Sequence, residues 1–321
     1  GLMNSVQDLG RPGYLDQGIG RGGAMDRPAL GIANLLAGND VGAAAIEVAV
    51  FPFRLRFLAP VDYAVTGALC SARLNGAELP PWWSGPAGAG DELRIDPPGE
   101  GARAYVALAG GIDVPEVLGA RATDLKSVFG GLEGRALMRG DRLALGGARG
   151  TRVSPSGRAA DPFYFRGRLG GIAGGAPLVL RIMPGAEFES FTGEAREALL
   201  SAEFTVSADN NRQGMRLEGP LLSLSRKLEL FSHGIMPGTI QVPPSGQPVI
   251  QLAEANTCGG YPKIGHVIEP DLWTLGQAPP GARMRFEIVR RETAVAAIRD
   301  EAWRLRRFAN LLAGQFAGKA G

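Results

Sequence analysis

The sequence predicts a mainly β protein with few helices, and three observations support this prediction. The chain of 321 residues contains 48 glycines and 23 prolines, which interrupt long helices. Short apolar runs bounded by Gly, Pro or Asp recur along it, as they do in barrels and sandwiches. The strand–helix alternation of a Rossmann sheet is missing from this pattern. The length exceeds one average domain and therefore favours two.

The predicted strands are these apolar runs, taken in chain order. In the first half they are residues 46–50, 53–57, 62–66, 92–95, 102–109 and 142–145. In the second half they are residues 179–183, 204–206, 215–218, 247–253 and 284–289. A small, polar segment at 146–160 has no hydrophobic period, so it predicts the joint between a first domain, residues 1–150, and a second, residues 151–290.

Three helices are predicted. The first follows Asp26, a good N-cap, and has Pro28 in its first turn. The second covers about residues 192–200 and begins at Thr192. The third occupies residues 291–321. Its apolar stripe is formed by Val295, Ile298, Ala302, Leu305, Ala309 and Leu312. We expect this stripe to dock on the protein's own barrel, with a partner interface as the alternative.

The bulk composition excludes several classes of partner and site. The formal charge of +2 gives no reason to expect nucleic acid or an anionic membrane. No apolar run reaches the length of a membrane helix, and no signal peptide is visible, so a cytoplasmic location is expected. The two cysteines, Cys70 and Cys258, are far apart, which fits a reducing compartment. His233 and His266 have no second ligand at metal-site spacing, so no metal is expected.

The segment from Ile235 to Gly265 combines turn formers and polar side chains, and Lys263 is its one cation. Proline and glycine fix the backbone, so that Gln241, Gln247 and Tyr261 can be aimed at a ligand. Such a site suits a neutral amide or ureide group better than a highly charged one. Tight turns that only join strands are the alternative.

Other motifs give weaker support to a functional interpretation. Residues 18–23 match the dinucleotide-binding fingerprint literally, but no apolar strand precedes them, so we do not expect a dinucleotide. Backbone amides of this loop and of the helix start at Asp26 could instead hold a carboxylate or phosphate. Cys258 could be a thiolate nucleophile paired with His266, although a small, partly buried residue is the favoured interpretation.

Two turn-rich segments contain arginines with amide and acid neighbours. Their candidate residues are Gln7, Asp8, Arg11, Asn211, Arg212 and Arg216. The planar guanidinium offers a fork of donors to a carboxylate or another anionic oxygen. In the alternative interpretation these arginines pair with Asp8 and Glu218 and only hold loops together.

Several short motifs occur in order along the chain. They are VQDLGRPGY (6–14), GAMD (23–26), ANLL (33–36), AAIE (44–47), AYVALAGGID (104–113), FGG (129–131), RLEGP (216–220), QVPPSGQP (241–248) and GGYPKI (259–264). Together they resemble the biotin-dependent carboxyltransferase family. This family includes allophanate hydrolase subunit 2, the C-terminal part of the carboxyltransferase of urea carboxylase and urea amidolyase, the C subunit of 5-oxoprolinase, and an antagonist of a histidine-kinase inhibitor.

The resemblance implies two cyclophilin-like β-barrel units, at 1–150 and 151–290, whose loops face a shared cleft, followed by a C-terminal amphipathic helix. It implies as partner a related cyclophilin-like barrel subunit, similar to allophanate hydrolase subunit 1 or to the B subunit of 5-oxoprolinase. A lactam-utilisation TIM-barrel subunit is a further possible partner. No covalently bound cofactor is expected, because residues 136–139 echo a biotin-attachment loop without its lysine.

Three functions are compatible with this resemblance. The preferred one is the C subunit of an ATP-dependent 5-oxoprolinase, which binds and activates a lactam for hydrolysis to glutamate and is active only with its partners. It is preferred because the chain is free-standing, without a biotin carrier or a carboxylase domain. The second is a carboxyltransferase that moves CO2 from carboxybiotin, supplied in trans, to a substrate nitrogen. The third is a non-catalytic antagonist of a histidine-kinase inhibitor.

The site roles follow from the same resemblance. Lys263, Gln247 and Tyr261 would stabilise a developing negative oxygen, and Asp8 would orient a substrate N–H. Substrate-binding residues would be Gln7, Arg11, Asp26, Asn211, Arg212, Arg216, Gln241, Thr257, Gly259 and Gly260. The family usually has an acid at the position of His233 and a tyrosine at that of Met215. The histidine therefore inherits no role, and the choice of substrate is open.

Overall fold

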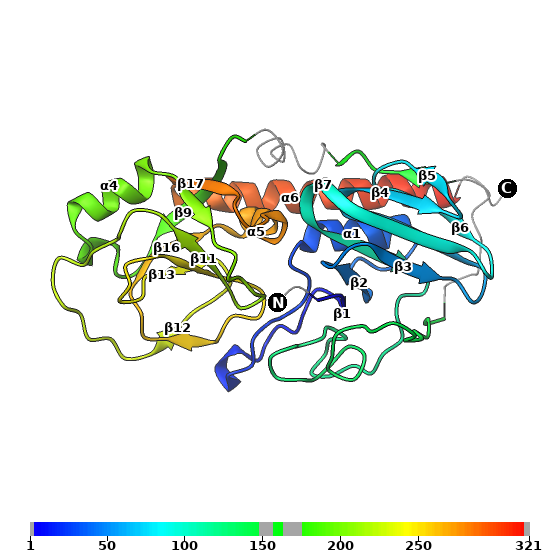
Figure 1. Cartoon of the computed structure of the whole chain (residues 1–321), viewed down its shortest axis with the longest axis horizontal. Coiled ribbons are helices and arrows are strands. Elements are labelled where there is room, and N and C mark those ends of the chain that lie inside the picture. The colour runs from blue at the N-terminus through cyan, green and yellow to red at the C-terminus, as the bar shows by residue number, and fades with distance from the viewer. Residues whose placement is uncertain (1–2, 148–156, 163–174, 318–321) are drawn as a thin grey trace. The chain divides into compact units, whose positions relative to one another are not determined.

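The computed structural model describes residues 3–147, 157–162 and 175–317 (Figure 1). The chain divides into two compact units. Unit 1 contains Pro12–Met25 and Arg168–Asp300, and unit 2 contains Leu2–Arg11, Asp26–Gly167 and Glu301–Gly321. Residues 12–25 thus group with the second half of the chain, because Gly22 donates a backbone hydrogen bond to Ala253 and Met25 lies in the core of unit 1. The joint expected at 146–160 falls largely outside the described residues.

Unit 2 is built on an eight-stranded sheet of order β1-β2-β7-β4-β6-β8, in which β3 also pairs with β7 and β5 with β4. The strands are β1 (Ser5–Gln7), β2 (Ala45–Val48), β3 (Phe53–Arg56), β4 (Val61–Leu74), β5 (Ala77–Leu79), β6 (Trp83–Ala87), β7 (Glu92–Leu108) and β8 (Arg158–Ala159). The register places Val6, Ile46, Val106 and Val65 in one row across four strands. This row belongs to the apolar core of the unit.

Helix α1 (Arg27–Leu36) lies against the strands of unit 2, mainly β4 and β7 (Figure 1). Its start follows from Asp26, whose side chain accepts a hydrogen bond from the Ala29 amide, as the sequence predicts. Ala29, Ile32 and Leu36 are buried. A short 3-10 turn, η1 (Leu15–Gln17), precedes the helix in unit 1.

Unit 1 contains a closed barrel of seven strands, β10-β11-β14-β13-β16-β9-β17. They are β9 (Leu178–Pro184), β10 (Phe204–Val206), β11 (Gly214–Glu218), β13 (Thr239–Gln241), β14 (Val249–Gln251), β16 (Lys263–Val267) and β17 (Arg283–Ile288). Neighbouring strands are antiparallel except β9 and β17, which are parallel and close the ring. A separate two-stranded ribbon joins β12 (His233–Gly234) to β15 (Cys258–Gly259). The mainly β prediction is therefore confirmed. Of the two barrel units expected, unit 1 contains a closed barrel and unit 2 the eight-stranded sheet.

Alternation along the barrel strands separates an apolar interior from a polar outer face. Ile240, Ile250 and Ile264 lie in the core of unit 1. Because successive side chains of a strand point to opposite faces, the adjacent residues Gln241 and Lys263 point outward. The outer face of β13 and β16 is the part of the fold that carries the candidate site.

The remaining helices of unit 1 are short. They are η2 (Phe188–Ser190), α4 (Gly193–Ser201), η3 (Glu269–Asp271) and α5 (Leu272–Gln277). Thr192 caps α4 by accepting a hydrogen bond from the Ala195 amide, which confirms the second predicted helix. The sequence does not predict α5, because its six residues are too few to show a helical period.

The C-terminal helix α6 (Arg291–Ala317) forms where the sequence predicts it, but its buried side differs. Ala294 and Leu312 are buried, whereas Ile298, which belongs to the predicted stripe, is 42% exposed. The predicted stripe is therefore wrong at Ile298 and at Ala302, which is also exposed. Apolar residues are spread around this helix, and their spacing alone does not decide which row is covered.

One predicted strand is wrong, and others differ in extent. Residues 142–145 form only a single bridge, between Leu145 and Ile112. The two runs at 92–95 and 102–109 belong to one long strand, β7, which continues through two prolines. Strands β13 and β16 are not predicted from the sequence, because these short runs are flanked by prolines and glycines, which are typical of turns.

Gly67 in β4 is required by close packing as well as by its dihedral. Its φ is +91°, and a Cβ atom there would lie 2.4 Å from the Arg103 carbonyl oxygen. Gly90 has a similar φ of +93° with nothing within 4 Å of the same position. We expect Gly90→Ala to cost about 1 kcal/mol and Gly67→Ala at least about 3 kcal/mol. Denaturant unfolding of the two variants measures the difference, and equal losses would contradict the packing argument.

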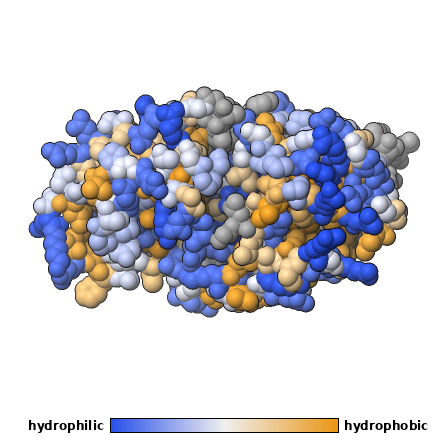
Figure 2. Space-filling model, in the orientation of Figure 1, coloured by the Kyte–Doolittle hydropathy of each residue, from blue (hydrophilic) through white to orange (hydrophobic). Residues whose placement is uncertain are grey.

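Within the described ranges, no helix is both long enough and apolar enough to cross a bilayer. The face shown in Figure 2 is a mixture of hydrophilic and hydrophobic residues.

Candidate functional site

The candidate site of unit 1 is centred on the ammonium group of Lys263, at the start of β16. The register pairs Lys263 with Gln241 of β13, so both side chains lie on the outer face of the barrel. Lys263 is only 5% exposed. Its Nζ donates to the Gly259 carbonyl oxygen at 2.8 Å and lies 3.2 Å from His233 Nδ1. Burial lowers the pKa of Lys263 below its ordinary range, and the charge of Glu187 offsets part of this shift.

Glu187 connects the backbone and the side chains of this cluster. Its Oε2 accepts the backbone N–H of Lys263 at 2.8 Å, and its Oε1 lies 3.6 Å from His233 Nε2. The His233 imidazole thus lies between the Glu187 carboxylate and the Lys263 ammonium. An arrangement of this kind holds a proton on a defined nitrogen of the histidine.

Two glutamines, Gln241 and Gln251, are hydrogen-bonded to each other next to Lys263 on the barrel. Gln251 Nε2 donates to Gln241 Oε1 at 3.0 Å. Gln241 is buried, and its Nε2 has no hydrogen-bond partner among the described residues. A Cβ atom on Gly259 would lie 2.6 Å from this nitrogen. Glycine at 259 lets the ribbon pack over Gln241 without displacing its amide, and no described residue accepts a hydrogen bond from that nitrogen.

Arg216 lies in the same row of the barrel, but far from Lys263. The register runs from Arg216 to Val249, to Gln241 and to Lys263 over four adjacent strands. Three strand spacings separate the two cations by about 14 Å along the sheet. The Arg216 guanidinium is exposed and contacts Asp209, through the backbone oxygen at 2.8 Å. A small substrate at Lys263 would not reach it.

The other candidate residues of the segment 241–261 are placed differently. Gln247 uses both ends of its side-chain amide on the backbone of Gly219, at 2.9 Å each. This glutamine staples a loop, and its place beside Lys263 is taken by Gln241. Tyr261 is 49% exposed. The Thr257 carbonyl accepts from the Ile235 amide, and Gly260 is close to the Leu230 carbonyl.

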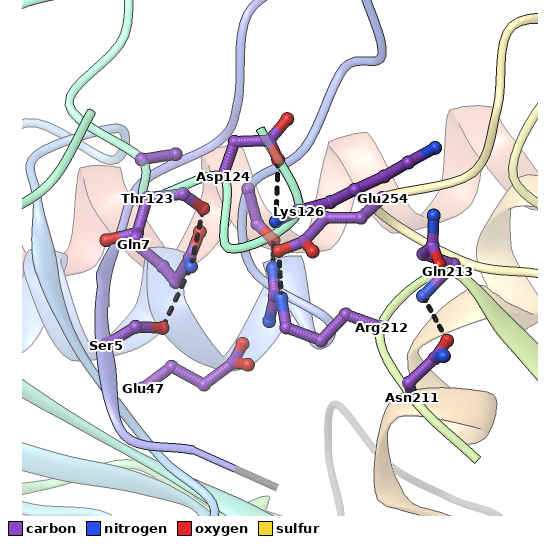
Figure 3. A network of polar contacts seen from close by, with 12 residues as sticks. Ser5, Gln7, Glu47, Thr123, Asp124, Lys126, Asn211, Arg212, Gln213 and Glu254 are labelled. Atoms are coloured by element: carbon purple, nitrogen blue, oxygen red, sulfur yellow. Dashed lines mark hydrogen bonds and ion pairs between the residues drawn. The ribbon is translucent and has the colours of Figure 1, made fainter. Parts of the chain in front are cut away.

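Unit 2 contains a second cluster, formed by the segment 5–11 and residues 121–129. Gln7 is fully buried and donates from Nε2 to Ser5 Oγ at 2.9 Å and to the Thr123 carbonyl at 3.1 Å (Figure 3). The Asp8 carboxylate accepts the backbone N–H groups of Gly10 and Arg121. These contacts make Gln7 and Asp8 parts of a rigid loop base.

Arg11 is buried beneath this loop. Its Nη2 donates to the Ala122 carbonyl at 2.6 Å, and its guanidinium lies 4.6 Å from the centre of the Phe129 ring. A cation over an aromatic face is a favourable contact that needs no anion. Arg11 therefore holds loops together, as the stapling alternative predicts, and its partners include a carbonyl oxygen and an aromatic ring.

Asp26 belongs to a buried network at the start of α1. Its backbone N–H donates to Tyr105 Oη at 2.7 Å, and this hydroxyl donates to Glu47 Oε2 at 2.8 Å. Burial raises the pKa of Tyr105 well above its ordinary value, and Glu47 adds to the shift. The Asp26 carboxylate already accepts the Ala29 amide, which an external anion at this helix start would require. The Ala29 amide is therefore not available to an external anion, and an anion site at the loop 18–23 stays a prediction.

Arg212 forms a buried ion pair with Glu254 in unit 1. Its Nε donates to Glu254 Oε1 at 2.5 Å, and its Nη2 donates to the Gly23 carbonyl at 2.5 Å. This second bond ties the segment 12–25 to the barrel. The neighbouring Asn211 accepts the amides of Gln213 and Gly214 and shapes the turn before β11 (Figure 3).

Sequence reasoning missed Glu187 and His233 and was wrong about Cys258. Glu187 and His233 lie 76 and 30 residues from Lys263, and nothing in their spacing relates them to it. Cys258 is exposed, because it lies on the open ribbon, so the partly buried interpretation is wrong. His266 faces Thr239 Oγ1 at 3.3 Å and is held there. No group of three metal-ligating side chains occurs within the described part of the chain.

Comparison with known proteins places the chain in a family. The family model for the carboxyltransferase domain, subdomain A and B, matches residues 17–288. The chain belongs to this carboxyltransferase family. It is 39% identical over 312 residues to the C subunit of the 5-oxoprolinase of Escherichia coli (strain K12), and the alignment covers 95% of this chain and 96% of that protein.

Two solved structures resemble this carboxyltransferase-family chain. The K. lactis urea amidolyase matches 95% of it with a TM-score of 0.85 at 27% identity, and the chain spans 19% of that protein. The structure of TTHA0988 matches 89% of it with a TM-score of 0.76 at 37% identity, and the chain spans 54% of that protein. The family expected from the motifs is confirmed. The expectation that loops of both units share one cleft stays a prediction.

Proposed function

We propose that this chain is the C subunit of an ATP-dependent 5-oxoprolinase, in which Lys263 binds the carbonyl oxygen of the lactam. The observation that carries the proposal is the buried ammonium, which donates to Gly259 O and lies 3.2 Å from His233 Nδ1. An ammonium has three hydrogens, so at least one donor remains for a ligand. The extent of the similarity to the corresponding 5-oxoprolinase subunit of Escherichia coli supports the choice of substrate.

The chemistry of the cluster suits an oxygen that becomes negative. When a lactam is activated, charge develops on its carbonyl oxygen. A preoriented cation in a site of low dielectric stabilises that charge without reorganising. Gln241 Nε2 is a second unused donor, but Gly259 covers it, so a ligand reaches it only when the ribbon moves. Lys263 is therefore the group assigned to the oxygen.

ATP fits this cluster poorly. The cluster has one cation, Lys263, beside the carboxylate of Glu187, whereas a triphosphate carries several negative charges that need several donors. In the proposed complex, ATP supplies the phosphoryl group that activates the lactam. We propose that ATP binds outside the Lys263 cluster, on the related barrel subunit or on the lactam-utilisation TIM-barrel subunit. We propose activity only in that complex, in the cytoplasm.

The test is reconstitution. The chain is co-expressed with the two proposed partner subunits, and release of glutamate from 5-oxoproline is followed with and without ATP. The proposal expects release that requires both ATP and this chain. A complex that assembles fully but releases no glutamate would refute it.

The lowered pKa of Lys263 predicts the pH dependence of this activity. The ammonium form binds the oxygen, and it is lost as the pH rises through the pKa of the folded state. Because burial places that pKa below the ordinary lysine value of 10.5, the rate should fall at a more acidic pH than for a free lysine. A pH–rate profile of the complex measures this limb. A rate that stays constant up to the unfolding pH would contradict it.

Carboxyl transfer is the second candidate, because the fold matches the urea amidolyase structure with a TM-score of 0.85. A ureido oxygen is also a neutral acceptor that becomes more negative in reaction, so Lys263 could hold it in the same way. Carboxybiotin bound there would supply CO2 to a substrate nitrogen. Carboxylation that depends on bicarbonate and a biotinylated partner, without release of glutamate from 5-oxoproline, would favour this candidate.

A further inference from the structure

The imidazole of His233 faces three groups, and they decide its tautomer. Its Nδ1 lies 3.2 Å from Lys263 Nζ and 3.1 Å from the Phe231 carbonyl oxygen. Its Nε2 lies 3.6 Å from Glu187 Oε1. Lys263 can donate to Nδ1 only if that nitrogen carries no proton. The Phe231 carbonyl oxygen favours a proton on Nδ1, whereas the positive charge of Lys263 and the Glu187 carboxylate both favour it on Nε2. Because a full charge outweighs a carbonyl dipole, the Nδ1 lone pair is left for the ammonium.

We propose that His233 is a positioning residue that orients the Lys263 ammonium towards the substrate. The inference rests on the proposed role of Lys263 and adds a second residue to it. With Gly259 O, His233 Nδ1 fixes two of the three N–H directions, and the tetrahedral geometry then fixes the third. Glu187 holds this arrangement from both sides, since it binds the Lys263 backbone and faces the imidazole.

Loss of the Nδ1 acceptor frees the ammonium to turn. Of its three N–H groups, only the one that donates to the Gly259 carbonyl would then keep its partner. The charged groups that face the imidazole from the packed elements are Lys263 of β16 and Glu187 before η2. A change at His233 is therefore transmitted directly to Lys263.

Three substitutions separate positioning from a merely structural role. The Asn side-chain oxygen can occupy the place of Nδ1, whereas that of Gln occupies the place of Nε2. In the assembled complex, His233→Ala and His233→Gln should lower kcat at least 10-fold with little change in KM. His233→Asn should stay within about threefold of the parent protein, because it keeps an acceptor for Lys263. Equal losses in all three variants, or no loss in any, would overturn the proposal.

A second measurement does not depend on the reaction. The chain has four lysines, Lys126, Lys227, Lys263 and Lys319, so 13Cε-labelled lysine gives four resolvable NMR signals in the full chain. Lys263→Arg identifies the signal of Lys263. This signal should change its chemical shift in His233→Ala, because the acceptor 3.2 Å from Nζ is lost. It should stay close to the parent position in His233→Asn, which keeps an acceptor.

A failure of the positioning role can be told apart from a failure of the proposed substrate. If the Lys263 signal does not change in His233→Ala, or changes equally in His233→Asn, the positioning role is wrong whatever the complex does. If the signal behaves as expected but no glutamate is released from 5-oxoproline, the proposed substrate is wrong and the Lys263–His233 pair stands.

Discussion

Replacing Lys263 with methionine should lower the kcat of the assembled 5-oxoprolinase complex by about 100- to 1,000-fold, the usual loss when one donor to a developing oxyanion is removed. Methionine retains the apolar stem and most of the volume. The fold should tolerate the change, because burial already makes the Lys263 charge unfavourable, as its lowered pKa shows. The measurement is the rate of ATP-dependent glutamate release, with the melting temperature of the variant recorded alongside.

Lys227→Met is the matched control. Lys227 is 87% exposed and forms its ion pair with Glu229 on the surface, so its charge has no buried acceptor to serve. The control should keep the parent rate within a factor of about two. If Lys263→Met also kept the parent rate in a stable complex, the oxyanion role would have to be abandoned. If Lys263→Met lost both its activity and its cooperative melting transition, the loss of activity would be assigned to unfolding.

Replacing Arg212 with alanine should destabilise the protein by about 3–5 kcal/mol. Arg212 and Glu254 are only 6% and 4% exposed, so removing the arginine leaves a buried carboxylate without its counter-charge. It also frees the Gly23 carbonyl, which the Nη2 group binds. The melting temperature should fall by about 6–20 °C, which calorimetry or circular dichroism can follow.

Arg216→Ala supplies the comparison, because Arg216 lies four residues further along the chain. Its ion pair with Asp209 is 3.5 Å long, and both side chains are largely exposed. The expected cost is below about 1 kcal/mol. A double variant, Arg212→Met with Glu254→Leu, removes both charges and should recover much of the stability lost by Arg212→Ala. A small loss in Arg212→Ala itself would show that the pair contributes little.

The fold was largely predictable where local chemistry decides it. Asp26 and Thr192 start helices because their side chains cap free amides, and each does so in the structure. Apolar runs bounded by turn residues gave the longer barrel strands. Short strands between prolines, such as β13, were not predictable, because their partners and not their own residues define them.

The candidate site was predictable only in part. Lys263 and Gln241 stood out as polar residues among rigid turns, but their pairing depends on the register between β13 and β16. Gln247 also lies among prolines and glycines, but its side chain binds the backbone of Gly219 and not the Lys263 cluster. His233 reaches Lys263 through the fold of the β12–β15 ribbon, a long-range relation that no local pattern encodes.

The parallel pairing of β9 with β17 has a consequence for synthesis on the ribosome. β9, the first strand of the ring in the sequence, pairs with β16 on one edge, but its other edge finds β17 only after residue 288 has left the exit tunnel, about a hundred residues later. Until then β9 presents an open edge that can recruit other nascent chains. Transcripts truncated before residue 283 should therefore yield insoluble products, and chaperones that bind emerging chains should matter most during this interval.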